Sequence, residues 1–225
     1  MHAVALHTPQ FGRHLDLLAA MYRLRRRVFK DRLDWSVSVS GEFELDMYDT
    51  LGPTYLILMS DRGEPVGSVR LLPTTGPTML ADTFPALLGG KAAPCDERIL
   101  ESSRFCVDTD LVAEQAGNGL NRATFALFAA MMEAARGADA DRIVTVTDTR
   151  MERILRRADW PLQRIAPPRE VGSTMAVAGF LEISEPALHR MYDRANVIGP
   201  VLRPADHVKA AAWPPVSYAA SDRSN

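Results

Sequence analysis

The sequence predicts one α/β domain, an α-β-α sandwich whose mixed central sheet is covered by helices on both faces. Three observations support this fold class. An apolar hairpin lies in the first third of the chain, strand and helix signals alternate in the second half, and no linker rich in Pro or Gly separates two cores. With 225 residues the chain can bury one large core, so we place a single domain at 1–204 and a loose tail rich in Ala, Pro and Ser at 205–225.

The N-terminal elements follow from the spacing of apolar residues. Residues 2–6 alternate weakly and predict a first strand, and residues 12–32 have helical spacing. The inward face of that helix is expected to carry residues three or four apart: Leu15, Leu18, Tyr22, Arg25 and Phe29. Residues 36–53 carry few helix signals and predict a loop with short extended pieces. A loop of this length in a compact domain usually has a function.

The rest of the chain alternates between strands and helices. A tight turn at 61–64 separates two apolar runs and predicts a hairpin, with Arg70 near the end of its second strand. Asn118 and Asp148 stand where they can cap the helices that follow them. The expected elements are, in order, strands at 54–59 and 65–72, one or two helical turns within 79–88, a strand at 98–107, a helix at 120–136, a strand at 142–147, a helix at 150–158, a strand at 175–183 and a helix at 185–196.

Arg25 is the unusual member of the first helix, because its spacing places a guanidinium in an inward stripe. Arginine keeps its charge in a protein, and a buried charge without a partner costs about 3–5 kcal/mol. The next stretch of sequence supplies carboxylates at Glu44, Asp46 and Asp49, with the aromatic Trp35 beside them. Two interpretations stay open: an ion-pair network that holds the long loop on the helix, and a pocket for a ligand with charges of both signs. One network can do both.

Three further sets of polar residues have a structural and a functional interpretation. Glu101 and Arg104 are three apart on a strand and point to opposite faces unless a bulge intervenes, so one of them can simply form a surface ion pair. Thr145 and Thr147 share a face of a strand, where threonine is common in any case. A basic helix face, either solvated or suited to an acidic partner, is formed by Arg150, Arg153, Arg156, Arg157 and Arg164.

Composition excludes several classes of protein. Apolar content of 47%, charged content of 24% and a net charge of −2 are those of an ordinary globular protein and do not suit one that coats nucleic acid. No run of about 18 apolar residues predicts a membrane span, and the N-terminus does not read as a signal peptide. Cys95, Cys106 and five scattered histidines have no metal-ligand spacing. We therefore expect reduced cysteines, no metal and a cytoplasmic protein.

A glycine pair at 117–119 follows a strand and opens a helix, which is a natural phosphate site. N-acyltransferases of the GNAT type carry a Gln/Arg-x-x-Gly-x-Gly/Ala loop at this point for the pyrophosphate of coenzyme A, and the chain resembles them in the spacing of Gly117 and Gly119. Glu114 stands where the basic or amide residue belongs. The resemblance thus supports the architecture, while the acidic residue weakens coenzyme A as the default ligand.

Two blocks of sequence resemble the signature of the acyl-homoserine-lactone synthases, the LuxI-type autoinducer synthases. The first block consists of Leu24, Arg25, Phe29, Arg32, Trp35, Val37, Glu44, Asp46, Tyr48 and Asp49. The second consists of Phe84, Glu101, Ser102, Ser103 and Arg104. The resemblance spans roughly residues 5–190 and implies a GNAT-like acyltransferase fold in an autoinducer-synthase domain. It implies an enzyme of quorum sensing that acylates the α-amine of S-adenosylmethionine from an acyl thioester and then closes a lactone, releasing methylthioadenosine.

The resemblance also implies roles for individual residues. Glu101 is the expected base, with Asp46 and Asp49 orienting the amine. The expected S-adenosylmethionine site and its ion-pair network comprise Arg25, Phe29, Trp35, Glu44, Arg70, Ser103, Arg104 and Phe105. The expected acyl pocket, with apolar members that also belong to the core, comprises Met79, Phe84, Leu100, Thr145, Thr147, Met151 and Met175. Acyl-carrier protein is expected to dock on Arg150, Arg153 and Arg157.

Two other functions stay open at this point. One is a coenzyme-A-dependent N-acetyltransferase, and the other is a regulator that binds a small molecule without turnover. The resemblance implies S-adenosylmethionine as a substrate, no prosthetic group, and either acyl-carrier protein or acyl-CoA as the donor. It leaves the acyl chain and the oligomeric state open.

Overall fold

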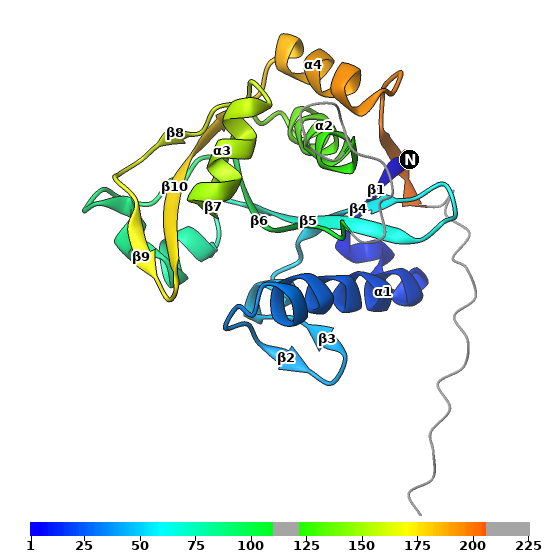
Figure 1. The fold of residues 1–225 in the computed structure, drawn as a ribbon, viewed down its shortest axis with the longest axis horizontal. Helices are drawn as coiled ribbons and strands as arrows, with labels where there is room; N and C mark the ends of the chain where they lie inside the picture. Colours follow the sequence, from blue (N-terminus) through cyan, green and yellow to red (C-terminus); the bar gives the residue numbers. More distant parts are fainter. Residues whose placement is uncertain (110–121, 206–225) are drawn as a thin grey trace, which may run out of the picture.

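The computed structural model describes residues 1–109 and 122–205 and has the predicted layers (Figure 1). Within these ranges nine strands form one mixed sheet in the order β11-β1-β4-β5-β6-β7-β10-β8, with β9 beside β10. The sheet strands are β1 His2–Leu6, β4 Thr54–Met59, β5 Pro65–Pro73, β6 Ile99–Val107, β7 Arg142–Asp148, β8 Gln163–Arg164, β9 Arg169–Val171, β10 Thr174–Glu182 and β11 Leu202–Pro204. The helix α1 lies on one face, while α2 and α4 lie on the other.

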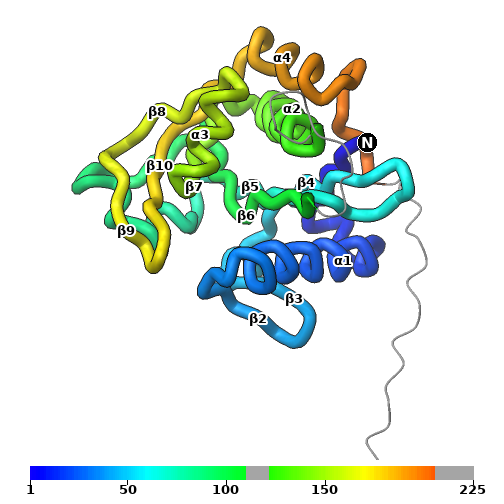
Figure 2. Tube along the Cα trace, viewed as in Figure 1, coloured from blue at the N-terminus to red at the C-terminus, as the bar shows by residue number. Residues whose placement is uncertain are grey.

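The remaining elements are helices and one small hairpin. The α-helices are α1 Leu15–Arg26, α2 Arg122–Gly137, α3 Thr149–Arg157 and α4 Glu185–Ala195. Short 3₁₀ turns lie at Thr8–Arg13, Met47–Thr50 and Pro85–Leu88, and π-helical turns at Arg27–Arg32 and Met79–Thr83. The hairpin of β2 Val39–Ser40 and β3 Phe43–Glu44 lies beside α1 (Figure 2). It supplies the extended pieces predicted for the long loop.

The sequence prediction fits the observed elements closely, with two main differences. The first helix begins at Leu15 rather than residue 12 and ends in a π-helical turn. The strands β8, β9 and β11 were not predicted, because runs of two or three residues show no alternation. The predicted glycine loop at 114–119 and, apart from Ala205, the predicted tail lie outside the described residues. No described helix is both long and apolar enough to span a membrane.

The prediction that Leu15 faces the core is wrong, since 64% of its surface is exposed. The buried side of α1 is centred on Leu17, Met21 and Leu24. At 100° per residue, Leu15 lies roughly a third of a turn from that line, and Tyr22 lies at its edge. The predicted inward face of α1 is therefore rotated about the helix axis relative to the observed buried face. Arg25 and Phe29 are nevertheless buried as expected.

Two packed faces position the rest of the molecule. Apolar residues of α2, α3 and α4 form one cluster with the side of the sheet that carries Val69, Leu71 and Ile143. On the opposite side, α1 packs over β1 and β4, and the turns at 79–88 pack over β6, β7 and β10. Helix α2 is buried over nearly its whole circumference because it lies between the sheet and α4 (Figure 1). The sheet thus separates an α1 face from an α2 face.

Asp148 caps α3 as predicted, since its side chain accepts a hydrogen bond of 2.7 Å from the backbone N–H of Met151. We expect Asp148→Ala to lower the free energy of unfolding by about 0.5–2 kcal/mol, because that N–H loses its partner at the helix start. Urea unfolding measures the change. Asp193→Ala, at an exposed position in α4, is the control and should change stability by less than about 0.5 kcal/mol. Equal effects of the two substitutions would contradict the capping role.

Candidate active site

Arg25 finds the carboxylates that its burial requires. Its Nε donates to Glu44 at 2.6 Å, and its two terminal nitrogens donate to Asp49 at 2.8 and 3.0 Å. Only 1% of the Arg25 side chain and none of the Glu44 side chain is exposed. Helix α1 supplies the arginine, β3 supplies Glu44 and the 3₁₀ turn after it supplies Asp49. The prediction that this loop carries the partners of Arg25 is confirmed for these two residues.

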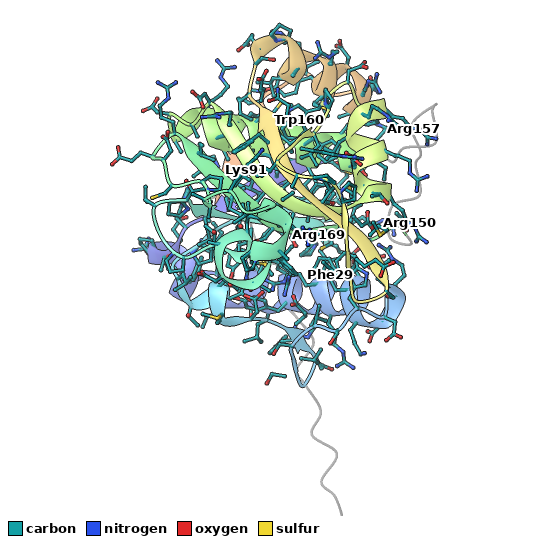
Figure 3. The ribbon with its side chains drawn as sticks, turned by 90° about the vertical axis from the view of Figure 1, so that its left-hand side faces the viewer. Phe29, Lys91, Arg150, Arg157, Trp160 and Arg169 are labelled. Atoms are coloured by element: carbon teal, nitrogen blue, oxygen red, sulfur yellow. The ribbon has the colours of Figure 1, made fainter. Side chains whose placement is uncertain are left out.

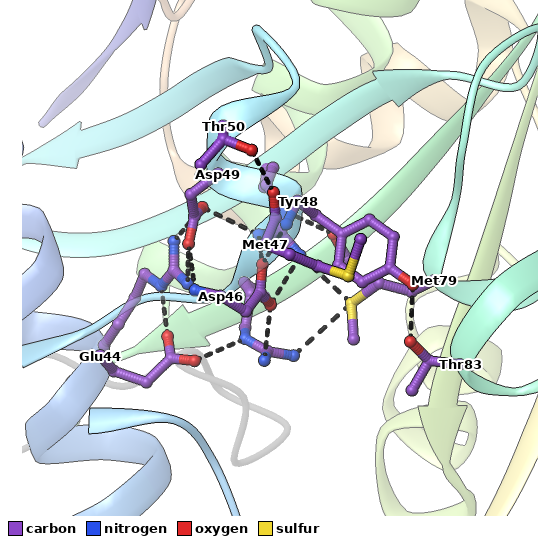
Figure 4. A network of polar contacts seen from close by, with 12 residues as sticks. Glu44, Asp46, Met47, Tyr48, Asp49, Thr50, Met79 and Thr83 are labelled. Atoms are coloured by element: carbon purple, nitrogen blue, oxygen red, sulfur yellow. Dashed lines mark hydrogen bonds and ion pairs between the residues drawn. The ribbon is translucent and has the colours of Figure 1, made fainter. Parts of the chain in front are cut away.

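Asp46 has other partners, which extend the network across the sheet (Figure 4). Arg70 Nη1 donates to Asp46 at 2.5 Å and to Asp49 at 2.8 Å. Arg104 approaches Glu44 through Nε at 2.9 Å and Asp46 through Nη2 at 2.7 Å. Three arginines and three carboxylates therefore alternate, and their formal charges cancel. Such mutual pairing is what allows charged groups to stay buried.

A β-bulge aims Arg104 at this network. Along the β5–β6 ladder, Ser68 pairs with Cys106 but Arg70 pairs with Ser103, so β6 contains one additional residue. Arg104 has a φ of 55°, which costs a residue with a side chain about 1–2 kcal/mol. The bulge is the exception foreseen for Glu101 and Arg104, because it turns both side chains to the α1 face. Ser103 joins them there and accepts a hydrogen bond of 3.0 Å from Arg70 Nε.

The loop that carries the acidic residues is itself held by hydrogen bonds. Asp46 accepts from the N–H of Tyr48 at 2.9 Å, and Asp49 accepts from the N–H of Asp46 at 2.8 Å. The Tyr55 hydroxyl donates to Asp49 at 2.7 Å. Burial alone would raise the pKa of Asp49, but the hydrogen bonds and charge of Arg25 outweigh it and hold that pKa well below its usual range. Sequence reasoning missed Tyr55, whose only signal was a hydroxyl within an apolar strand.

Glu101 lies beneath the turn at 79–83. Its two carboxylate oxygens accept the backbone N–H groups of Met79 and Leu80 at 2.9 and 2.7 Å, and 1% of its surface is exposed. Burial raises the pKa of Glu101 above its ordinary value, although the two N–H groups act in the opposite direction. The Tyr48 hydroxyl lies 2.6 Å from that of Thr83 and ties the same turn to the acidic loop. Glu101 thus fixes a turn beside Arg70 and Arg104.

The structure brings together two of the three aromatic residues predicted for the site. The rings of Phe29 and Trp35 stack with centroids 5.4 Å apart, and the Arg104 guanidinium lies 5.8 Å from the centre of Phe29. Phe105 lies on the opposite side of β6, where its ring packs 5.1 Å from Phe128 of α2. The aromatic residues that accompany the ion-pair network are therefore Phe29 and Trp35.

The residues predicted for the acyl pocket divide between the two faces of the sheet. Met79 and Phe84 pack with Tyr48 and Leu72 on the α1 face. The α2 face carries Leu100, Thr145, Thr147 and Met151. The residues predicted to line a single acyl pocket thus lie on both faces of the sheet around β6 and β7.

Met175 does not belong to the core as predicted, since 41% of its surface is exposed. It is the second residue of β10, next to the turn that leads from β9, and only from Ala176 onward do the residues of this strand become buried. Apolar character alone did not distinguish this strand end from the strand centre.

The strands β6 and β7 separate in the middle of the sheet. Their parallel ladder runs from the pair Ile99 and Arg142 to the pair Ser102 and Thr145. The strands themselves continue to Val107 and Asp148. Thr145 closes the paired part by donating its hydroxyl to the Ser102 carbonyl at 3.0 Å. Beyond this point the facing edges of the two strands do not pair with each other.

The arginines predicted for docking lie on the outer side of α3. Arg150, Arg153 and Arg157 are exposed, and Figure 3 shows Arg150 and Arg157 at the periphery of the molecule. Arg153 donates to the Thr149 carbonyl at 3.2 Å, whereas Arg164 pairs with Glu152. The hydrogen bond from Arg164 holds the pKa of Glu152 below its ordinary value. The basic face thus exists, with one of its arginines already neutralised.

A mixed sheet that opens between two parallel strands, with helices on both faces, is the GNAT-like fold that the sequence resemblance predicted. The sequence model described as "Autoinducer synthase" matches residues 12–191, and the chain belongs to that family. The acyl-homoserine-lactone synthase of Agrobacterium fabrum is 44% identical over 80% of this chain and 86% of its own. These findings confirm the family predicted from the two sequence blocks, and with it an acyl-transferring enzyme that makes an acyl-homoserine lactone.

Solved structures agree with this assignment. The structure of the acyl-homoserine-lactone synthase LasI has a TM-score of 0.72 at 35% identity and covers 88% of this chain and 98% of its own. A structure of BjaI, a CoA-dependent acyl-homoserine lactone synthase solved with S-adenosylmethionine and isopentyl-CoA, has a TM-score of 0.80 at 24% identity and covers 90% of this chain and 92% of its own. The second likeness concerns the fold. Membership of the autoinducer-synthase family favours the synthase function over the N-acetyltransferase and regulator alternatives.

Proposed function

We propose that the chain makes a quorum-sensing signal by two reactions on one bound S-adenosylmethionine. The α-amine attacks the carbonyl carbon of an acyl thioester, which forms an amide and releases the thiol. A carboxylate oxygen then attacks the γ-carbon, and the carbon–sulfur bond breaks with its electron pair on sulfur, which yields the lactone and methylthioadenosine. The observation that carries this proposal is the network in which Arg25, Arg70 and Arg104 pair with Glu44, Asp46 and Asp49 on the α1 face of the sheet.

The charge of this network suits S-adenosylmethionine. The three arginines balance Glu44, Asp46 and Asp49, and Glu101 adds one negative charge. The ligand carries an ammonium, a sulfonium and a carboxylate, which together give one positive charge. The site therefore needs no further ion when this ligand binds. Carboxylates and aromatic faces are also the groups that attract its two cations.

Exposure identifies the residues of the network that a ligand can reach without a rearrangement of the site. The side chains of Asp46 and Arg104 are 12% and 14% exposed, whereas Arg25 and Arg70 are almost fully buried. We assign Asp46 to the amine and Arg104 to the carboxylate. Asp49 already accepts hydrogen bonds from two arginines and Tyr55, so it positions Asp46 through the loop. Lactone closure then depends mainly on orientation.

Glu101 is the base in this proposal, either directly or through a water molecule. Each of its oxygens accepts one N–H and keeps capacity for a second hydrogen bond. An α-ammonium titrates near pH 8, so removing its proton at neutral pH is a modest task. Burial raises the pKa of Glu101 and brings it closer to that of the ammonium.

The separated strands give the acyl donor a place. An extended, amide-bearing arm can add to the free edges of β6 and β7 by backbone hydrogen bonds, as peptides add to sheet edges. Its acyl chain would then lie against Leu100, Thr145 and Met151.

We expect Thr145→Ala to change the preferred acyl chain by a few-fold in kcat/KM while total activity persists. Competition between 3-oxo and saturated thioesters measures this, and an unchanged preference would contradict the placement.

The exposed arginines of α3 suit acyl-carrier protein, whose helix surface is acidic. We expect the double substitution Arg153→Glu and Arg157→Glu to raise KM for acyl-carrier-protein donors by about tenfold or more, because like charges then meet at the interface. KM for acyl-CoA should change less. Arg62→Glu, in the exposed turn between β4 and β5, is the control. An equal increase in KM for both donors would contradict docking of acyl-carrier protein. It would mean that the arginines bind coenzyme A or stabilise the fold.

The reaction is tested with purified protein, S-adenosylmethionine and a panel of acyl-carrier-protein and acyl-CoA thioesters. Mass spectrometry should detect an acyl-homoserine lactone together with methylthioadenosine, and the preferred thioester identifies the substrate. A protein that binds acetyl-CoA but not S-adenosylmethionine would contradict the proposal.

We place the enzyme in the cytoplasm, because Cys95 and Cys106 are both unpaired thiols, as is usual in a reducing compartment.

A further inference from the structure

Two guanidinium groups of the site point at a methionine. Arg70 Nη2 lies 3.1 Å from the sulfur of Met79, and Arg104 Nη1 lies 3.6 Å from it (Figure 4). For Arg104 Nη1 this sulfur is the sole acceptor among the described residues. A thioether accepts hydrogen bonds weakly, whereas a carboxylate accepts them strongly from a guanidinium. Arg70 Nη2 also donates to Asp46 at 3.1 Å, so the methionine sulfur shares this nitrogen with a carboxylate, whereas Arg104 Nη1 has only the weak acceptor among these residues.

The backbone of Met79 is held by hydrogen bonds, whereas the polar contacts of its side chain are only those of a thioether sulfur. Glu101 holds the Met79 N–H at 2.9 Å, and the hydroxyl of Thr78 caps the same turn by accepting from the N–H of Ala81 at 3.2 Å. The methionine side chain lies among Tyr48, Leu72 and Phe84, and within residues 1–109 and 122–205 its sulfur has the two arginines as its polar partners. Three rotatable bonds let such a side chain repack at small cost.

We propose that the sulfur of Met79 occupies the place of the substrate's α-carboxylate, and that S-adenosylmethionine displaces it on binding. The inference rests on the proposed function and assigns its anion subsite to Arg70 Nη2 and Arg104 Nη1. In the free enzyme Met79 gives one terminal nitrogen of each guanidinium a weak acceptor, beside the carboxylates that already pair with both arginines. In the complex the carboxylate replaces a weak acceptor with a strong one. Met79 is therefore a positioning residue. When its side chain moves away, the carboxylate binds Arg70 of β5 and Arg104 of β6.

Two substitutions at Met79 should act in opposite directions. Met79→Leu keeps the volume but removes the acceptor, so the free enzyme loses a hydrogen bond that the complex never had. We expect about 3- to 10-fold tighter S-adenosylmethionine binding. Met79→Gln supplies an amide oxygen of similar reach, which competes with the carboxylate, so S-adenosylmethionine should bind about 3- to 10-fold more weakly. Methylthioadenosine lacks the carboxylate, and its affinity should stay the same in both variants.

Isothermal titration calorimetry with both ligands tests the inference. Met191→Leu, at a buried methionine of α4 outside the proposed site, is the matched control and should alter neither affinity. Opposite changes for Met79→Leu and Met79→Gln, confined to S-adenosylmethionine, support the displacement. Changes of equal size for both ligands, or none for either, overturn it while leaving the proposed function standing. A wild-type protein that binds neither ligand would overturn the proposed function, and this inference with it.

Discussion

Arg25→Ala is expected to lower the free energy of unfolding by about 3–5 kcal/mol and to abolish product formation. The substitution leaves Glu44, which is fully buried, with Arg104 alone, and it removes two of the hydrogen bonds to Asp49. The acidic loop is then no longer held against α1. Urea unfolding and the lactone assay measure the two effects. Arg98→Ala, which breaks an exposed pair with Asp141, is the control and should cost about 1 kcal/mol or less.

The same variant should respond differently to acid. The folded-state pKa of Asp49 is lowered mainly by Arg25, so its contribution to stability is present above the ordinary carboxyl range. That contribution is lost as the pH falls through this range toward the lowered pKa. Wild-type stability should therefore fall more steeply with acid than that of Arg25→Ala. Equal slopes, or a loss below about 1 kcal/mol, would mean that the network is not a source of stability.

A double variant separates the contribution of the Arg25–Glu44 ion pair from that of the packing around it. Adding Glu44→Gln to Arg25→Ala removes the buried charge that the first substitution leaves under-compensated. The double variant should be less destabilised than the sum of the two single variants, by about 1 kcal/mol or more, because the residues are in contact. Additive losses would instead assign the cost to lost packing of the arginine stem.

Local patterns predicted the scaffold of the site because each depends on neighbouring residues. Helical spacing revealed Arg25 as an inward charge, and elementary electrostatics then required the acidic loop to lie near it. The hairpin followed from a turn at 61–64 between apolar runs. Asp148 was recognisable as a cap because an aspartate preceding a helix has few other uses.

Long-range geometry could not be predicted in the same way. The bulge depends on a left-handed backbone at Arg104, a conformation that the residue type does not favour. The pairing of Asp46 with Arg70 and Arg104 depends on how β5 and β6 meet under the loop. Leu100 and Met79 share apolar character but not a face of the sheet, which spacing within separate segments does not reveal.

Glu101→Gln is expected to lower kcat by about 10²- to 10⁴-fold, the usual contribution of a general base. The amide cannot take a proton from the substrate ammonium, and its NH₂ group faces one of the two backbone N–H donors at Met79 and Leu80. Wild-type activity should fall as the pH drops through the raised pKa of Glu101, because the protonated acid no longer accepts a proton. Kinetics across pH, with the fold checked by circular dichroism, measure both effects.

The pH profile distinguishes a base from a residue that only holds the turn. If Glu101 is the base, the acidic limb of kcat disappears in Glu101→Gln together with most of the rate. If it only positions Met79 and Leu80, the rate falls but the limb remains, and thermal stability falls with the rate because a buried N–H loses its acceptor. A folded variant within about threefold of wild-type kcat would exclude both roles. The base would then have to come from the accessible end of the network, where Asp46 is the nearest carboxylate to the proposed amine position.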